Sequence, residues 1–254
     1  MLKVSIIQAP LVWEDKKANF DYFSSKINAI PDTDLVVLPE MFLTGFSMNP
    51  EDNFITMDSS YISEIISLAQ HKKVAITGSL IIKHDDHYYN RLLFIFPDGS
   101  FKTYDKKHLF SLAKEEKFYT PGSDKLIVDY KGWTICPLIC YDLRFPVFSR
   151  NVENYDLVLY VASWPDKRIY AWDSLLKARA IENMAYTIGV NRIGVDGYKA
   201  TYNGHSQILD YMGQYVVEPF EDEAVHTVTL TKENREKAVS KLGFLNDQDT
   251  FTIN

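Results

Sequence analysis

The chain has 254 residues, of which 46% are hydrophobic and 24% are charged, and 34 acidic against 27 basic side chains give a formal net charge of −7. This composition argues against a disordered or fibrous chain, and the acidic balance offers no basic stripe for nucleic acid. No apolar run approaches the roughly 20 residues that cross a bilayer, and the run at residues 2–7 is too short for a signal peptide. We therefore expect a cytoplasmic protein, with no nucleic-acid or membrane partner, whose two cysteines stay reduced.

Predicted strands and helices alternate along the chain. Apolar or β-branched runs predict strands, and apolar residues three or four positions apart predict helices. We expect helices between Asp15 and Pro31, over 61–70, over 172–184, and from a cap at Thr231 to near Gly243. The expected strands cover 4–9, 35–38, 74–82, 88–96, 101–104, 126–128, 134–139, 156–162, 185–190, 206–210, 215–217 and 225–230. No linker interrupts this pattern, so we predict one α/β domain over residues 1–254, with a pair of mixed sheets covered by helices.

Glu40 is the first residue that could carry chemistry. It follows the apolar strand 35–38 and Pro39, so the strand would deliver a half-desolvated carboxylate, which is suited to proton transfer. The alternative is a glutamate that caps a helix or lies on the surface.

Two adjacent lysines, Lys106 and Lys107, follow the predicted strand 101–104. Side chains alternate along extended backbone, so the two lysines point to opposite sides. A buried ammonium can stabilise a developing oxyanion, whereas the alternative is a solvated pair at the edge of a sheet.

Cys140 ends the apolar strand 134–139 at a sharp turn. This arrangement favours a nucleophile on an elbow, with the backbone N–H of Tyr141 directed at an oxyanion. The alternative is a small buried hydrophobic residue, and Cys136, within the strand, fits that alternative. The C-x3-C spacing matches neither a redox pair nor a zinc site, so we expect no metal.

These residues together resemble the nitrilase superfamily of carbon–nitrogen hydrolases, over essentially the whole chain. The resemblance implies a catalytic triad of Glu40, Lys106 and Cys140, no cofactor, an α-β-β-α sandwich and a homodimer. It aligns Glu115 with the second active-site glutamate of the family, with Glu116 as the competing assignment. It is carried by Leu-Pro-Glu at 38–40, Lys-Lys-His-Leu-Phe at 106–110 and Ile-Cys-Tyr-Asp-Leu-Arg-Phe-Pro at 139–146. Val147 departs from the family, which usually has a glutamate there; we expect this to affect only packing or assembly.

Finer motifs resemble the omega-amidase group of that superfamily. They lie at 40–48, 163–165, 178–183 and 189–194. The group hydrolyses the terminal amide of short 2-oxo acid amides, such as 2-oxoglutaramate and 2-oxosuccinamate, and releases ammonia. The resemblance therefore implies a small-molecule amide as substrate.

The carboxylate of such a substrate requires a cation. We assign this role to Arg168, with a solvated loop arginine as the alternative, and expect Arg144 to brace the elbow through an ion pair. Phe42 and Trp164 are predicted apolar walls of the substrate pocket, or otherwise ordinary core residues.

Other interpretations remain open at this stage. The chain could hydrolyse an N-carbamoyl compound, a simple amide or a nitrile, or it could be a catalytically idle interaction module on the same fold. The turn at His84–His87 is expected to be solvated rather than a metal site, and His205 to be a turn residue rather than the base of a cysteine–histidine dyad.

Overall fold

The computed structural model describes residues 1–252. Its helices are α1 (Lys16–Ala29), α2 (Pro50–Asn53), α3 (Ser60–Lys72), α4 (Pro146–Ser149), α5 (Ile169–Asn183) and α6 (Lys232–Leu242). Short 3-10 turns are η1 (Ser111–Ala113), η2 (Glu115–Lys117), η3 (Cys140–Arg144), η4 (Asp166–Arg168) and η5 (Phe244–Asp247). The strands are β1 (Leu2–Gln8), β2 (Leu35–Val37), β3 (Ala75–His84), β4 (His87–Ile95), β5 (Phe101–Asp105), β6 (Val128–Tyr130), β7 (Trp133–Ile139), β8 (Leu157–Val161), β9 (Tyr186–Val190), β10 (Ile193–Val195), β11 (Thr201–Asn203), β12 (Ser206–Leu209), β13 (Tyr215–Phe220) and β14 (Ala224–Leu230).

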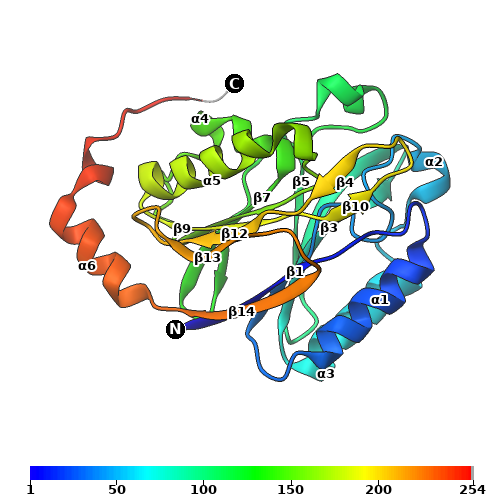
Figure 1. Cartoon of the computed structure of the whole chain (residues 1–254), viewed down its shortest axis with the longest axis horizontal. Helices are drawn as coiled ribbons and strands as arrows, with labels where there is room; N and C mark the ends of the chain where they lie inside the picture. The colour runs from blue at the N-terminus through cyan, green and yellow to red at the C-terminus, as the bar shows by residue number, and fades with distance from the viewer. Residues whose placement is uncertain (253–254) are drawn as a thin grey trace.

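The strands form two six-stranded mixed sheets and one small hairpin. One sheet has the order β14-β1-β2-β3-β4-β5 and the other β13-β12-β9-β8-β7-β6, while β10 and β11 pair separately. The central strands β1, β2 and β3 are parallel, as are β7, β8 and β9. In each sheet, the three parallel strands are flanked by antiparallel strands, which tolerate solvent on one face. The two sheets face each other (Figure 1).

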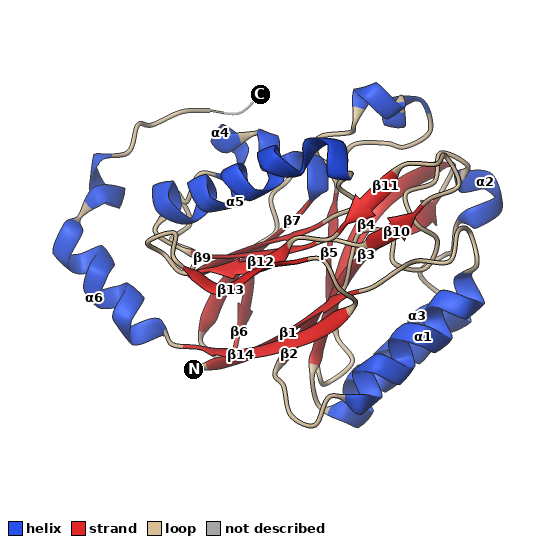
Figure 2. Cartoon of the chain, in the orientation of Figure 1, coloured by secondary structure: helices blue, strands red, loops and turns tan. Residues whose placement is uncertain are grey.

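Strand β2 shows how the layers are held together. Leu35 and Val37 point into the core between the two sheets, whereas Val36 points into a second core beneath the helices. Side chains alternate along a strand, so a strand buried on both faces favours apolar residues at successive positions, as in β2. Helices α1 and α3 cover the outer face of this sheet, and α5 packs on the other sheet (Figure 2). The predicted α-β-β-α sandwich is confirmed.

Several predicted boundaries were wrong for identifiable reasons. Leu126 and Ile127 lie before β6, which begins only at Val128. Helix α5 begins at Ile169 rather than 172, because turn η4 leads directly into it. The elements α2, α4, β10 and β11 have only three or four residues, too few to show a hydrophobic period. The expected C-terminal helix is confirmed as α6, with Thr231 at its N-cap position and Gly243 left-handed at its end (φ 69°).

The candidate chemistry lies where strands end. Glu40 follows β2, Lys106 follows β5, Cys140 follows β7 and Ser163 follows β8. Met41 (φ 45°) and Cys140 (φ 43°) both have left-handed backbone, a conformation that costs a non-glycine residue on the order of 1–3 kcal/mol and that gathers at functional sites. No helix within residues 1–252 has the length and apolar character needed to cross a membrane.

Candidate active site

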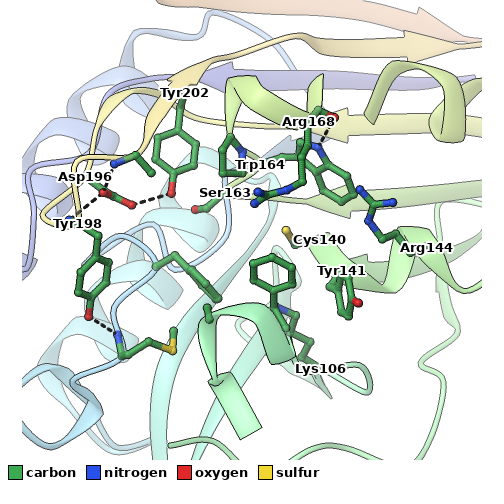
Figure 3. A pocket seen from close by; sticks show the side chains of 16 residues that line it. Lys106, Cys140, Tyr141, Arg144, Ser163, Trp164, Arg168, Asp196, Tyr198 and Tyr202 are labelled. Carbon is green, nitrogen blue, oxygen red and sulfur yellow. Dashed lines mark hydrogen bonds between the residues drawn. The ribbon is translucent and has the colours of Figure 1, made fainter. Parts of the chain in front are cut away.

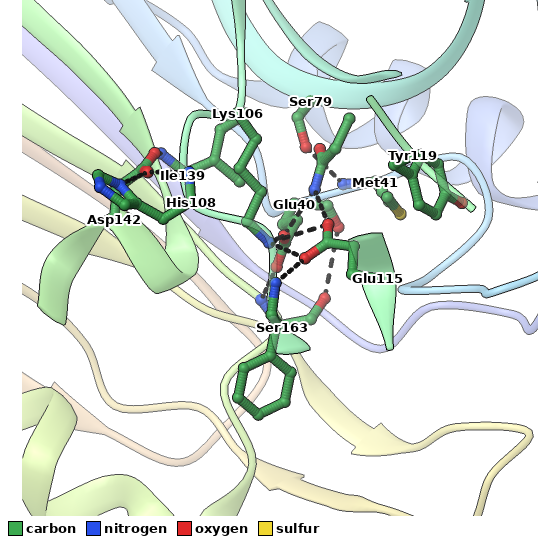
Figure 4. Close-up of polar contacts among 12 residues, drawn as sticks. Glu40, Met41, Ser79, Lys106, His108, Glu115, Tyr119, Ile139, Asp142 and Ser163 are labelled. Atoms are coloured by element: carbon green, nitrogen blue, oxygen red, sulfur yellow. Dashed lines mark hydrogen bonds and ion pairs between the residues drawn. The ribbon is translucent and has the colours of Figure 1, made fainter. Parts of the chain in front are cut away.

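Glu40 lies buried at the meeting point of the two sheets. Its Oε2 accepts a hydrogen bond from the backbone N–H of Ser163 at 2.8 Å, and its Oε1 accepts from Lys106 Nζ at 2.9 Å. The next residue, Met41, donates its backbone N–H to Ser79 Oγ at 2.9 Å. These contacts hold the carboxylate in one orientation (Figure 4).

Lys106 lies between two carboxylates. Besides Glu40, it contacts Glu115 Oε2 at 2.9 Å and Oε1 at 3.1 Å, and all three side chains are fully buried. Glu115 also accepts from the backbone N–H of Phe110 at 2.5 Å. The structure thus brings Glu115 against Lys106 and leaves Glu116 exposed. Lys107 is only partly buried, as the alternation predicted.

Asn90 on β4 was not singled out from the sequence. Its Nδ2 donates to Glu40 Oε1 at 2.8 Å and approaches Glu115 Oε1 at 3.4 Å, while its Oδ1 is buried without a hydrogen-bond partner. Asn90 therefore bridges the two carboxylates. Nothing in the sequence signalled it, because a single asparagine within a strand belongs to no catalytic motif.

The cluster holds two carboxyl groups for one ammonium. Burial lowers the pKa of Lys106, but Glu115 and Glu40 outweigh burial and hold it above its ordinary value, so the ammonium stays charged. Burial raises the pKa of Glu115; the charge of Lys106 opposes this and the charge of Glu40 adds to it. Because one ammonium serves two carboxyl groups, the cluster can take up and release a proton during a reaction.

The elbow that carries Cys140 is fixed by Asp142. The buried Asp142 carboxylate accepts from Ile139 N at 3.0 Å, Tyr104 OH at 2.7 Å and His108 N at 3.1 Å, and pairs with His108 Nδ1 at 2.8 Å. Because Tyr104 and His108 flank Lys106 in the chain, Asp142 ties the cysteine loop to the lysine loop.

The two thiols have different surroundings. Burial is the main cause that raises the pKa of Cys140; the charge of Glu40 adds to it, and Lys106 opposes it. Cys140 is 9% exposed and faces a cavity, whereas Cys136 is fully buried, and burial raises its pKa too. Cys140 is therefore a neutral thiol beside a carboxylate, and Cys136 is a core residue.

A cavity of about 430 Å³ opens above Cys140, which is large enough for a small substrate. Its walls are mostly apolar and aromatic, including Phe46, Phe110, Tyr141 and Trp164 (Figure 3). The remaining lining residues are Met48, Lys106, Ala113, Arg144, Ser163, Pro165, Arg168, Asp196, Tyr198, Ala200 and Tyr202. The contributions of Phe46, Tyr198 and Tyr202 depend on loops and on the β10–β11 hairpin, which the sequence did not predict.

Two arginines face this cavity. The Arg168 guanidinium lies 5.2 Å from the centre of the Phe110 ring, and that of Arg144 lies 4.9 Å from the Trp164 ring. Arg168 and Trp164 thus lie where a substrate could meet them. The expected ion pair of Arg144 was wrong: its cation stacks on Trp164 and forms no ion pair within residues 1–252.

Three further residues considered in the sequence analysis, Phe42, His205 and His84, lie outside the cavity lining. Phe42 does not line the cavity but packs in the core under α1 and α3, with its ring 5.6 Å from that of Phe23, so its assignment as a pocket wall was wrong. The reason is that the chain turns sharply at Met41 and sends the next side chain back into the core. His205 pairs with Asp173 (Nδ1–Oδ2 2.9 Å) away from the cavity lining, and His84 lies exposed at a hairpin tip.

Comparison with known proteins identifies the family. The family model for carbon–nitrogen hydrolases matches residues 3–238. This chain belongs to the carbon–nitrogen hydrolase family.

This carbon–nitrogen hydrolase has well-covered relatives. It is 45% identical over 217 residues to the omega-amidase YafV of Yersinia enterocolitica, covering 84% of this chain and 83% of that one. It is 31% identical over 237 residues to a 2-oxoglutaramate amidase of Paenarthrobacter nicotinovorans, covering 87% and 80%. A solved carbon–nitrogen hydrolase superfamily protein of Xanthomonas campestris, which carries an arsenic adduct in its active site, is 40% identical with a TM-score of 0.97, covering 100% and 99%. The resemblance noted in the sequence is confirmed.

Proposed function

We propose that this carbon–nitrogen hydrolase cleaves the terminal amide of short 2-oxo acid amides, such as 2-oxoglutaramate, to a carboxylate and ammonia. One observation carries the proposal: a thiol, a buried Glu–Lys–Glu cluster and two arginines meet at one small cavity. The thiol and cluster suit acyl transfer, and the arginines suit an anionic substrate. The names of the two amidase relatives point to the same chemistry.

Formation of the thioester is the first half of the reaction. Glu40 accepts the proton of the Cys140 thiol as the sulfur attacks the amide carbon. A base is required, because the raised pKa of Cys140 leaves almost no thiolate at neutral pH. Glu40 then donates that proton to the departing nitrogen, the C–N bond breaks, and ammonia leaves a thioester behind.

The oxyanion of this step would be held by Lys106 and by the backbone N–H of Tyr141. The ammonium of Lys106 has three N–H groups: when Glu40 Oε1 accepts one and the two oxygens of Glu115 share a second, the third is left for an oxyanion in the cavity that Lys106 lines. Tyr141 lies in the first turn of η3, where backbone N–H groups have no partner within the helix. Loss of one such donor typically costs about 10²- to 10³-fold in rate.

Hydrolysis of the thioester is the second half. Glu40 accepts a proton from water, the hydroxyl adds to the thioester carbon, and the C–S bond breaks as the proton returns to sulfur. Glu115 and Asn90 do not touch the reacting atoms in this scheme. They position Lys106 and Glu40, and Trp164 and Arg168 hold the substrate.

Ammonia release tests the proposal. Wild-type protein and Cys140→Ala are assayed with 2-oxoglutaramate, with a nitrile and a simple amide as comparison substrates. We expect release from the oxo-amide that Cys140→Ala abolishes, while Cys136→Ala retains it. Activity only on the nitrile or the simple amide would reject 2-oxo acid amides as substrates but leave Cys140 as the nucleophile. No activity on any of them would instead favour an idle interaction module.

We also propose a cytoplasmic homodimer. Tyr170 and Ile181 on α5 and Val147 on α4 expose 84%, 52% and 53% of their surface, an apolar group on the side of one sheet that a second copy would cover. Both cysteines are free thiols, which suits a reducing compartment. Sedimentation of wild type and Ile181→Glu checks the dimer, and cell fractionation checks the compartment. A monomer that Ile181→Glu leaves unchanged would reject the interface.

A further inference from the structure

Asn191 holds the chain just after strand β8. Its Oδ1 accepts from the backbone N–H of Trp164 at 2.8 Å, and its Nδ2 donates to Trp164 O at 2.9 Å and to Gly204 O at 2.7 Å. Backbone pairing between β8 and β9 extends to Ala162, whose N–H donates to Val190 O at 2.8 Å. The fully buried side chain of Asn191 then replaces backbone pairing where the chain leaves the sheet. Because buried backbone groups require partners, this contact fixes both backbone groups of Trp164.

The segment that Asn191 holds also serves the two reacting groups. Ser163 donates its backbone N–H to Glu40 Oε2 at 2.8 Å, and Ser163 and Cys140 both line the cavity (Figure 3). Burial is the main cause that raises the pKa of Cys140, and the charge of Glu40 adds to it. Lys106 and the backbone N–H of Ser163 act on this pKa in the opposite direction. A single N–H therefore holds the carboxylate and stabilises the thiolate.

We propose that Asn191 is a positioning residue for the acyl-transfer reaction, because it directs the Ser163 N–H at Glu40 and Cys140; this rests on the function proposed above. Ser163 lies between a residue that the sheet holds and Trp164, which Asn191 holds, so its backbone has one orientation. Without Asn191, Trp164 can rotate and the Ser163 N–H loses its direction. Misplacement by about 1 Å can cost on the order of 10²-fold in rate, so Asn191 controls the reaction from behind the cavity wall.

The chain carries a matched control at the other end of β8. Asn151 Oδ1 accepts from the backbone N–H of Tyr155 at 2.7 Å, and its Nδ2 donates to Tyr155 O and to Asn183 O at 3.0 Å each. Asn151 is fully buried, as Asn191 is. Each asparagine thus holds both backbone groups of one aromatic residue and a further carbonyl, but Asn151 does so before β8 begins. Replacing either should cost comparable stability, and only Asn191 should affect the active site.

Alkylation of Cys140 tests the inference without any substrate. The midpoint pH of labelling by iodoacetamide is compared in Glu40→Gln and in the same variant with Asn191→Ala or Asn151→Ala added. The carboxylate charge of Glu40 is absent from all three proteins, so a difference between them reports on the Ser163 N–H. We expect Asn191→Ala to raise the midpoint by about one pH unit, the value for one hydrogen bond to a charged group. Asn151→Ala should leave the midpoint unchanged.

Steady-state kinetics on 2-oxoglutaramate test the same inference with Glu40 in place. Asn191→Ala should lose about 10- to 100-fold in kcat, less than removal of the general base costs, with a smaller change in KM. Asn151→Ala should keep the wild-type kcat per folded molecule, although urea unfolding should show a similar loss of stability. Asn191→Ser and Asn151→Ser, whose hydroxyl can keep part of each contact, repeat the comparison if the alanine variants do not fold.

Equal alkylation midpoints in the folded Asn191 and Asn151 variants would overturn the inference, and so would a lowered midpoint in the Asn191 variant. A kinetic loss confined to KM would also overturn it, since Asn191 would then support only the Trp164 wall of the cavity. A wild type that is inactive on every amide, while Asn191→Ala still raises the midpoint in the Glu40→Gln protein, would instead reject the proposed function and support the positioning of the thiol.

Discussion

Two ionic clusters within residues 1–252 have different properties. In the active-site cluster, Lys106 lies between Glu40 and Glu115. In the α6 cluster, Arg235 on the C-terminal helix donates to Asp156 Oδ1 at 2.6 Å, and Lys232 contacts Asp156 Oδ2 at 2.7 Å. Both clusters join segments distant in sequence; the active-site cluster is fully buried, whereas Lys232 of the α6 cluster keeps 30% of its side chain exposed.

The clusters differ in how completely hydrogen bonds and opposite charges satisfy their polar groups. Arg235 also donates to Met184 O at 2.7 Å and Tyr155 O at 2.8 Å, and Asp156 accepts from Thr134 N at 3.0 Å. The active-site cluster instead has two carboxylates for one ammonium and the unpaired Oδ1 of Asn90. A buried ion pair is thus no sign of function by itself; excess charge beside a cavity is the more informative feature.

The largest effect should follow from Glu40→Gln. Loss of a general base typically costs about 10²- to 10⁴-fold, so kcat should fall by that factor. Unfolding by urea should change little, because Lys106 keeps Glu115 as its buried partner. Glu116→Gln, at an exposed position, is the matched control and should retain its activity.

The Glu40→Gln variant should also change the pH at which Cys140 reacts. Burial raises the pKa of Cys140 and the negative charge of Glu40 raises it further, so removing that charge lowers the pKa of the thiol. In Glu40→Gln, alkylation of Cys140 by iodoacetamide should therefore begin at lower pH than in wild type. A midpoint that is unmoved or moves upward would contradict the placement of Glu40 beside the nucleophile.

Arg235→Met should act on stability instead. Removing one partner of a buried ion pair leaves the other uncompensated and costs about 3–5 kcal/mol, measured as the loss in free energy of unfolding in urea. Activity per folded molecule should be retained. Lys237→Met, on the exposed side of α6, is the control for changes to this helix. A loss of kcat in folded Arg235→Met would show that the two clusters are not separate in function.

Asn90 offers a finer distinction between charge and shape. Asn90→Leu removes the donor shared by Glu40 and Glu115, which should cost about 1–3 kcal/mol in stability. Asn90→Asp adds a third carboxylate to a cluster with one cation and should lose more of both stability and kcat. Urea unfolding and steady-state kinetics measure the two effects. Equal losses in both variants would mean that charge at this position is unimportant.

Cys136→Ala should have the smallest effect. A buried substitution of this size costs about 1 kcal/mol, and kcat should not change. Intact-mass measurement after brief iodoacetamide treatment should show one label per chain in wild type and in Cys136→Ala, and none in Cys140→Ala. Labelling of Cys136 in the folded protein would contradict its full burial.

Local sequence patterns predicted most of the strands and the reactive residues that follow them. Strand β2 is apolar at every position because both of its faces are buried. Lys106 and Cys140 directly follow strands, and Glu40 comes three positions after the end of β2. Such residues are recognisable because a strand and the turn after it are contiguous in the chain. The family resemblance and the fold class could be predicted from these segments, and both are confirmed.

Tertiary structure decided which other residues join them. Asn90 bridges two carboxylates 50 and 25 positions away, Phe42 turns into the core although it follows the Glu40 motif, and Arg144 stacks on Trp164 instead of pairing with an acid. Each outcome depends on which groups from distant segments arrive at one place. The sequence alone determines where a strand ends and which side chain it presents; the packing of the two sheets determines what that side chain meets.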